Sequence, residues 1–164
     1  MIKLTQMINA YVFDLSRTLL FPKDKSYKGE LNKLYKELIN THNFNFSDYF
    51  YLDEEILSYL EYLKRKCDLY IFTSGTIQNA PEIKPRLHEI FKKIYSAEEM
   101  GLSKKDMNAY MKLSEKMKVK AYEIMYVDDS EVNIKAARSA GLNAILFTDF
   151  INLRKNLQKH LSSN

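Results

Sequence analysis

The sequence predicts an α/β fold of three layers, with a mostly parallel five-stranded sheet between two layers of helices. Five short apolar segments are typical of buried strands, and amphipathic helical segments separate them. Strands that alternate with helices favour a parallel sheet that is covered on both faces. The length of 164 residues suits one domain with one core.

The expected strands are spread over most of the chain, and the third is the weakest. They are Asn9–Phe13, Leu69–Phe72, Ile94–Ser96, Ile124–Val127 and Ala144–Phe147. Ligands of such sheets bind beyond the carboxyl ends of the strands. We therefore expect polar residues that follow these strands to gather at one edge of the sheet.

Helical patterns lie between and after the strands. They cover Asp53–Lys66, Ser103–Met117, Ser130–Ala140 and Asp149–Leu161. Asp53, Ser103 and Ser130 are suited to cap the helix N-termini that they precede. Gly141 follows the third of these helices, where a glycine often ends a helix in the left-handed conformation.

Residues 21–52 interrupt the alternation. They hold one helical segment, Glu30–His42, and an aromatic stretch, FNFSDYFYL. We expect a small insertion of a single domain that spans residues 1–164. Its aromatic residues could line the entrance of a site or simply pack on the core, and the sequence leaves both interpretations open.

Composition excludes several classes of protein. Hydrophobic residues make up 46% and charged residues 28%, as in a globular protein. Cys67 is the only cysteine, so there is no internal disulfide. No segment approaches the ~18 apolar residues of a membrane span, and the first ten residues do not resemble a secretory signal. These features favour a cytoplasmic protein without a membrane partner.

The net charge is small. Lysine and arginine number 25 and aspartate and glutamate 21, which gives +4, and the lysines are scattered among acids. This pattern favours solvated helix faces over a surface for nucleic acid. We therefore expect no nucleic-acid partner.

Three carboxylates stand at the ends of expected strands. Asp14 ends the first strand, and Asp128–Asp129 end the fourth. Taken singly, Asp14 could cap a turn and the pair could cap the helix at Ser130. Taken together, they would repel one another at one edge of the sheet. A divalent cation offsets such repulsion, and Mg²⁺ binds through a few carboxylates, waters and phosphate.

Two further residues suit a phosphate. Lys104 carries a positive charge, and Thr73 offers a hydroxyl at the end of the second strand. The helix N-terminus that follows Thr73 could add backbone amides. Phosphate and Mg²⁺ together therefore fit this edge of the sheet.

Four segments resemble the motifs of the haloacid dehalogenase-like superfamily, in the right order. They are YVFDLSRTL, IFTSG, GLSKKDMNAY and IMYVDDSEVNIKAARSAGL. The last is the most specific, and the resemblance covers nearly the whole chain. It implies a Rossmann-like fold with a minimal or absent cap domain.

The resemblance also implies roles for individual residues. Asp14 would attack phosphorus and form an aspartyl phosphate. Thr73, with Ser74 and Gly75 after it, would bind the transferring phosphoryl group, and Lys104 would stabilise its charge.

The implied cofactor is Mg²⁺. Its ligands would be Asp14, the backbone carbonyl of Ser16 and Asp129. Asp128 would bind directly or through water.

Two positions depart from the pattern of the superfamily. Ser16 stands where its phosphatases carry a second aspartate, the general acid/base, whose help is worth typically 10²–10⁴-fold. The chain is then a slow enzyme, or one for easy leaving groups, or one that takes its acid from elsewhere, with Asp48 and His42 the nearest candidates by type. Arg17 stands where glycine or asparagine is common, and it is either exposed or directed at a substrate anion.

The resemblance implies a Mg²⁺-dependent phosphatase or phosphotransferase, with a phosphorylated small molecule or macromolecule as substrate. The alternative is a weak or inactive regulatory protein that holds metal and phosphate, which the serine at position 16 favours. A metal-free carbon–halogen hydrolase is disfavoured because Asp128–Asp129 form a paired-acid metal site.

Overall fold

A five-stranded parallel sheet forms the centre of the protein, whose computed structural model describes residues 7–161. The first six residues, part of the N-terminal segment considered above, lie outside this range. The strand order is β5-β4-β1-β6-β7, and all neighbouring strands are parallel. The strands are β1 (Ala10–Phe13), β4 (Asp68–Thr73), β5 (Lys93–Ser96), β6 (Ile124–Asp128) and β7 (Asn143–Leu146). The predicted fold class is confirmed, and each predicted strand is present to within one residue at either end.

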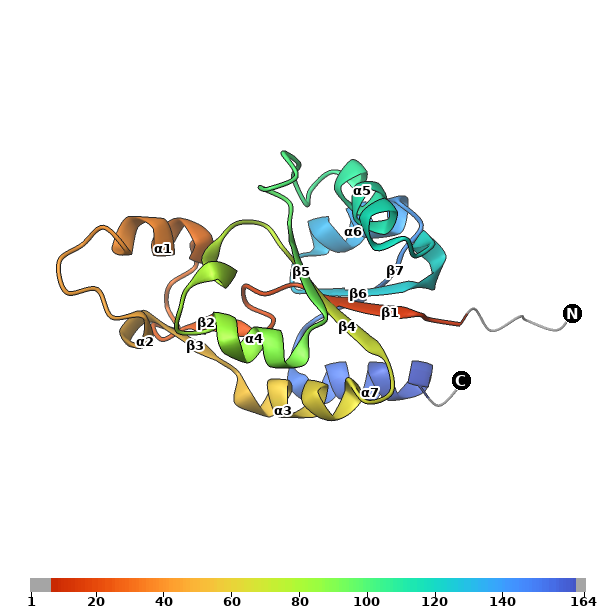
Figure 1. Ribbon diagram of the computed structural model, residues 1–164, viewed down its shortest axis with the longest axis horizontal. Helices are drawn as coiled ribbons and strands as arrows, with labels where there is room; N and C mark the ends of the chain where they lie inside the picture. Colours follow the sequence, from red (N-terminus) through yellow and green to blue (C-terminus); the bar gives the residue numbers. More distant parts are fainter. Residues whose placement is uncertain (1–6, 162–164) are drawn as a thin grey trace, which may run out of the picture.

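Helices cover both faces of the sheet (Figure 1). One face carries α5 (Met107–Met117) and α6 (Glu131–Ser139), and the other carries α3 (Glu54–Leu63), α4 (Lys84–Ile90) and α7 (Phe150–Leu161). Alternate residues of β1 pack into two separate apolar clusters, one on each face of the sheet. Because both faces are buried, the strands are continuous apolar runs in the sequence.

The helix ends follow their capping residues. Asp53 caps α3 by accepting hydrogen bonds from the amides of Glu55 and Ile56, and Ser130 caps α6. The predicted start of α5 at Ser103 is wrong, since this helix begins at Met107 with Asp106 as its cap. Residues 103–106 form a turn instead, which keeps Lys104 out of the helix.

The insertion is a small cap with its own strands and helices, which we call the cap. Strands β2 (Leu20–Pro22) and β3 (Phe50–Leu52) pair antiparallel, and α1 (Leu31–Leu38) and α2 (Phe46–Tyr49) lie between them. The predicted helix Glu30–His42 is therefore shorter than expected. Polar residues follow its last turn, and Asn43 then turns the chain in the left-handed conformation, with φ of 61°.

The aromatic stretch of the cap packs on itself and on the core. Phe46 and Phe50 are buried with ring centroids 5.0 Å apart, and Tyr35 contacts both rings. Tyr49 and Tyr51 are partly exposed, and each stacks on a neighbouring phenylalanine. Packing, and not the entrance of a site, is thus the role of these side chains.

The cap lies beyond the carboxyl ends of the central strands, as Figure 1 shows. Two short 3-10 helices complete the described part of the chain, Ile77–Asn79 after β4 and Ala121–Glu123 before β6. Within residues 7–161, no helix has both the length and the apolar character needed to cross a membrane.

Candidate active site

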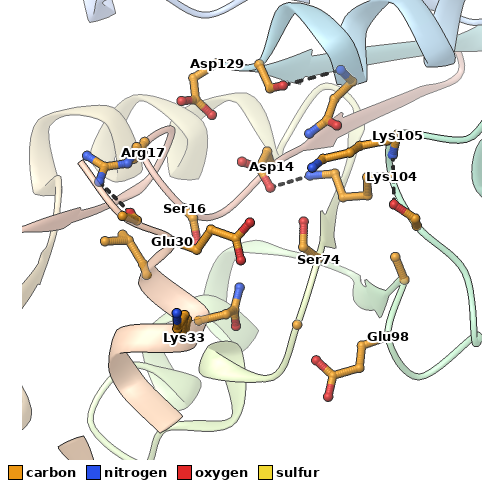
Figure 2. A pocket seen from close by; sticks show the side chains of 18 of the residues that line it. Asp14, Ser16, Arg17, Glu30, Lys33, Ser74, Glu98, Lys104, Lys105 and Asp129 are labelled. Carbon is orange, nitrogen blue, oxygen red and sulfur yellow. Dashed lines mark hydrogen bonds and ion pairs between the residues drawn. The ribbon is translucent and has the colours of Figure 1, made fainter. Parts of the chain in front are cut away.

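A cavity of about 840 Å³ opens between the carboxyl edge of the sheet and the cap (Figure 2). The core contributes side chains that follow β1, β4, β5 and β6, and the cap contributes the start and one face of α1. The sequence-predicted residues in its wall are Asp14, Ser16, Arg17, Ser74, Gly75, Lys104 and Asp129. Residues that are far apart in the sequence therefore meet at one edge of the sheet.

A buried lysine joins two of the acids. The ammonium nitrogen of Lys104 lies 2.5 Å from Oδ1 of Asp14 and 2.8 Å from Oδ2 of Asp128. The rings of Phe72 and Tyr126 flank the same nitrogen at 5.7 and 5.5 Å from their centroids. Because Lys104 is only 3% exposed, its charge acts on these carboxylates without screening by water.

Asp128 lies beneath the cavity and does not line it. Its Oδ1 accepts a hydrogen bond from the amide of Ser130 at 2.8 Å, and Oδ2 accepts from Asn133 at 3.1 Å and from the hydroxyl of Tyr126. With Lys104 added, most lone pairs of this carboxylate have partners. Asp128 therefore caps the turn before α6, which is one of the two roles that the sequence suggested for it.

The crowding of acids raises their pKa values. Burial and the neighbouring charge of Asp128 raise the pKa of Asp14 to about 8, although Lys104 opposes the shift. The same two causes raise the pKa of Asp129 to about 6. Burial alone would lower the pKa of Lys104, but the charges of Asp14 and Asp128 outweigh it and raise the value. The site thus has a surplus of negative charge that one lysine does not neutralise.

This surplus fits a divalent cation. Oxygen atoms of Asp14, Asp128 and Asp129 lie within 4.8 Å of one another. Asp14 and Asp129 face the cavity, while the oxygens of Asp128 have partners within the protein. Hard cations such as Mg²⁺ prefer carboxylate and carbonyl oxygens. Asp14 and Asp129 are therefore the residues that suit direct contact with the metal.

Two hydroxyl side chains follow one another at the end of β4, Thr73 and Ser74, and they differ in exposure to the cavity. Thr73 is completely buried, and its hydroxyl has no hydrogen-bond partner within the described chain. It does not line the cavity, whereas Ser74 is exposed and points into it (Figure 2). The side chain that the cavity presents to a ligand after β4 is thus Ser74, with Gly75 behind it.

Arg17 adopts the left-handed backbone conformation, with φ of 61°. Glycine and asparagine reach this conformation most easily, which explains why they are common here in the superfamily. The guanidinium donates hydrogen bonds to the carbonyls of Tyr27 and Gly29, at 2.9 and 2.8 Å. Neither sequence interpretation included this contact, by which the core holds the loop before α1.

A second contact fixes the cap to the core. The side-chain oxygen of Asn32 accepts hydrogen bonds from the amides of Thr76 and Ile77, at 2.9 and 3.0 Å. A Cβ atom on Gly75 would lie 2.5 Å from the Asn32 side chain, so only glycine permits this approach. The start of α1 is therefore held against the loop after β4.

The cap does not place His42 or Asp48 in the cavity. Both are exposed, and Asp48 hydrogen-bonds Asn45 within the cap. Sequence reasoning missed two cap acids that line the cavity, Glu30 and Glu37, of which Glu30 points toward the centre (Figure 2). An acid at the start of the predicted helix was visible in the sequence, but no spacing rule connects it with Asp14.

Fold and site together define a three-layer α/β protein with an aspartate at the end of its first strand and a cluster of acids around it. The profile of the haloacid dehalogenase-like hydrolase family matches residues 6–147. The chain belongs to this family, as its four motifs indicated. A search of curated proteins found no match.

Solved structures with the same fold have low sequence identity. The family enzyme BT-2542 from Bacteroides thetaiotaomicron, in complex with magnesium and inorganic phosphate, is 16% identical with a TM-score of 0.68, over 89% of this chain and 98% of that one. A HAD-like family hydrolase from Porphyromonas gingivalis is 16% identical with a TM-score of 0.66, over 93% and 98%. A hydrolase from Streptococcus pneumoniae TIGR4 is 17% identical with a TM-score of 0.61, over 92% and 98%.

Proposed function

We propose that this hydrolase is a Mg²⁺-dependent phosphatase or phosphotransferase that works through an aspartyl phosphate on Asp14. The observation that carries the proposal is the buried contact of Lys104 with Asp14 and Asp128, at the floor of a cavity that Asp14 and Asp129 also face. A lysine so placed orients a carboxylate and offers positive charge to an incoming phosphate. The substrate is a phosphorylated small molecule or macromolecule, and not a nucleic acid or a membrane.

Each residue then has a role that its position supports. Asp14 is the nucleophile, and Lys104 fixes its orientation through the contact at 2.5 Å. Ser74 and Gly75 hold the phosphoryl oxygens, because the amides of Thr76 and Ile77 further along this loop already donate to Asn32. Asp14, Asp129 and the carbonyl of Ser16 hold Mg²⁺, which when bound would neutralise phosphate charge.

The relatives support the same proposal. BT-2542 has the fold of this chain and was solved in complex with magnesium and inorganic phosphate. The cluster of Asp14, Asp128 and Asp129 offers acids for an equivalent metal.

The test is phosphate release from p-nitrophenyl phosphate and acetyl phosphate, with Mg²⁺ and with excess chelator. We expect Mg²⁺-dependent release that Asp14→Asn abolishes, because the amide keeps the shape but lacks the nucleophilic charge. Asp48→Asn is the matched control, since this acid lies in the cap outside the cavity. Full activity of Asp14→Asn, or release that ignores Mg²⁺, would refute the proposal.

One observation favours a second candidate, a regulatory protein that binds metal and phosphate with little turnover. Ser16 lines the cavity where related phosphatases carry the general acid, and its hydroxyl has no partner within the described residues. Calorimetry separates the candidates when it is combined with the assay. Binding of Mg²⁺ and inorganic phosphate without any Asp14-dependent turnover identifies the regulatory protein.

A further inference from the structure

The serine at position 16 leaves the proposed reaction without a proton donor from the first motif. A hydroxyl has no pKa suited to protonate an alkoxide or to activate water, and this contribution is worth typically 10²–10⁴-fold. The missing carboxyl group can come from another element only if that element is held close to Asp14. The cap is the element that faces Asp14 across the cavity.

Three glutamates line the cavity, and they differ in their surroundings. Glu98 is occupied by an ion pair with Lys36 at 2.8 Å, near the outer part of the cavity. Glu37 lies on α1, roughly 9 Å further along the helix than its first residue by the 1.5 Å rise per residue. Glu30 precedes α1, and Figure 2 shows its carboxylate directed toward the region between Asp14 and Ser74.

The side chain of Glu30 is free for another task. Glu30 occupies the N-cap position of α1, yet its side chain makes no capping hydrogen bond. It is exposed to the cavity and to solvent, so substrate and water can both reach it. A capping carboxylate would instead turn back to the amides of its own helix.

The backbone on both sides of Glu30 is held by the core. The carbonyl of Gly29 accepts the hydrogen bond from Arg17, and Leu31 is 1% exposed within the main apolar cluster. Asn32 is bound to the amides of Thr76 and Ile77. The fixed backbone therefore keeps the Cα atom of Glu30 in a constant place relative to Asp14, from which its side chain reaches into the cavity.

We propose that Glu30 is the general acid/base of this enzyme and replaces the carboxyl group that Ser16 lacks. The inference rests on the proposed function. In the first step, Asp14 attacks phosphorus, the bond between phosphorus and the leaving oxygen breaks, and the proton of Glu30 passes to that oxygen to give the alcohol. In the second step, Glu30 takes a proton from water, the water oxygen attacks phosphorus, and the bond to Asp14 breaks. Inorganic phosphate leaves, and Glu30 is protonated again.

The test compares two classes of substrate in matched variants. Alkyl phosphates, such as glycerol and sugar phosphates, leave as basic alkoxides and need a proton, whereas p-nitrophenyl phosphate leaves without one. We expect Glu30→Gln to lower kcat/KM for alkyl phosphates about 100-fold or more, and to change it less than tenfold for p-nitrophenyl phosphate. Asp48→Asn, in the cap but outside the cavity, should leave both values close to those of the wild type. The double variant Ser16→Asp with Glu30→Gln should recover alkyl phosphate hydrolysis.

The aryl substrate also reports on folding in every preparation. Equal losses for both substrates would show a structural role and overturn the inference. So would an unchanged Glu30→Gln, or a wild type that hydrolyses aryl phosphates alone. In these cases a dependence on Asp14 would leave the proposed function standing, whereas a wild type without any Asp14-dependent release would refute both.

Discussion

The replacement Lys104→Met should destabilise the protein strongly when no metal is bound. The ammonium nitrogen contacts Asp14 at 2.5 Å and Asp128 at 2.8 Å, and the three side chains are 2%, 7% and 0% exposed. Water therefore cannot take the place of the lost charge. Breaking a buried pair by removing one partner costs about 3–5 kcal/mol.

This loss is large for a chain of 164 residues. A loss of 1 kcal/mol lowers Tm by about 2–4 °C at this size, so we expect a fall of roughly 6–20 °C. Asp128 keeps hydrogen bonds from Ser130, Asn133 and Tyr126, so the cost falls mainly on Asp14. The double variant Lys104→Met with Asp14→Asn should therefore recover part of the stability.

The effect should also depend on pH with a definite sign. The folded pKa of Asp14, about 8, is above its ordinary value of 3.8, so the folded state holds this proton more tightly than the unfolded state. The free energy of unfolding then falls as pH rises between these two values. Removal of Lys104 raises the folded pKa further, so the variant goes on losing stability above pH 8 and the deficit of Lys104→Met should be larger at pH 9.5 than at pH 5.

The measurement is denaturant unfolding in chelator at both pH values, with Lys105→Met as control. Lys105 is the exposed neighbour in the same loop, and its replacement should cost little. If Lys104→Met unfolds within about 1 kcal/mol of the wild type at pH 9.5, or with the same deficit at pH 5, our account of the buried cluster is wrong.

Three further predictions concern the metal and the link to the cap. Mg²⁺ should raise Tm more at pH 8 than at pH 5.5, because the raised pKa values of Asp14 and Asp129 keep these carboxyl groups protonated in acid. Equal shifts of Tm at the two pH values in thermal scans would contradict this prediction. Asn32→Ala should lower the free energy of unfolding by about 2 kcal/mol, because the amides of Thr76 and Ile77 lose their acceptor. Asn32→Asp keeps an acceptor oxygen and should retain most of the wild-type stability. Equal denaturation curves for the two variants would exclude this role of Asn32 as acceptor. Gly75→Ala should also lower stability, since the new Cβ would meet Asn32 at 2.5 Å, and a wild-type denaturation midpoint would show that the cap moves away freely.

The parallel sheet was predictable from the sequence because each strand is buried on both faces. Continuous apolar runs such as Ile124–Val127 follow directly from that environment. The starts of α3 and α6 were also predictable, because short polar side chains that suit an N-cap, Asp53 and Ser130, precede them in the sequence. The convergence of Asp14 and Asp129 followed from topology, since parallel strands end at one edge.

Other features depend on contacts that a sequence pattern does not contain. The antiparallel pairing of β2 with β3 joins segments almost thirty residues apart, with no turn signal between them. Ser103 looked like a helix cap, but the salt bridges of Lys104 keep this segment in a loop. Two neighbouring residues at the end of β4 carry hydroxyl groups, and Thr73 is buried whereas Ser74 is exposed. Only the register of the sheet decides which of the two side chains faces the cavity.

The double attachment of the cap has a consequence for the timing of each catalytic cycle. In many enzymes a lid opens on the microsecond to millisecond scale, and this opening limits product release. Here Arg17 holds the loop before α1 and Asn32 holds its first turn, so an opening of the cap would have to break these hydrogen bonds to the core. Under the proposed function, the dimensions of the cavity mouth, and not the opening of a lid, would then select among phosphate esters.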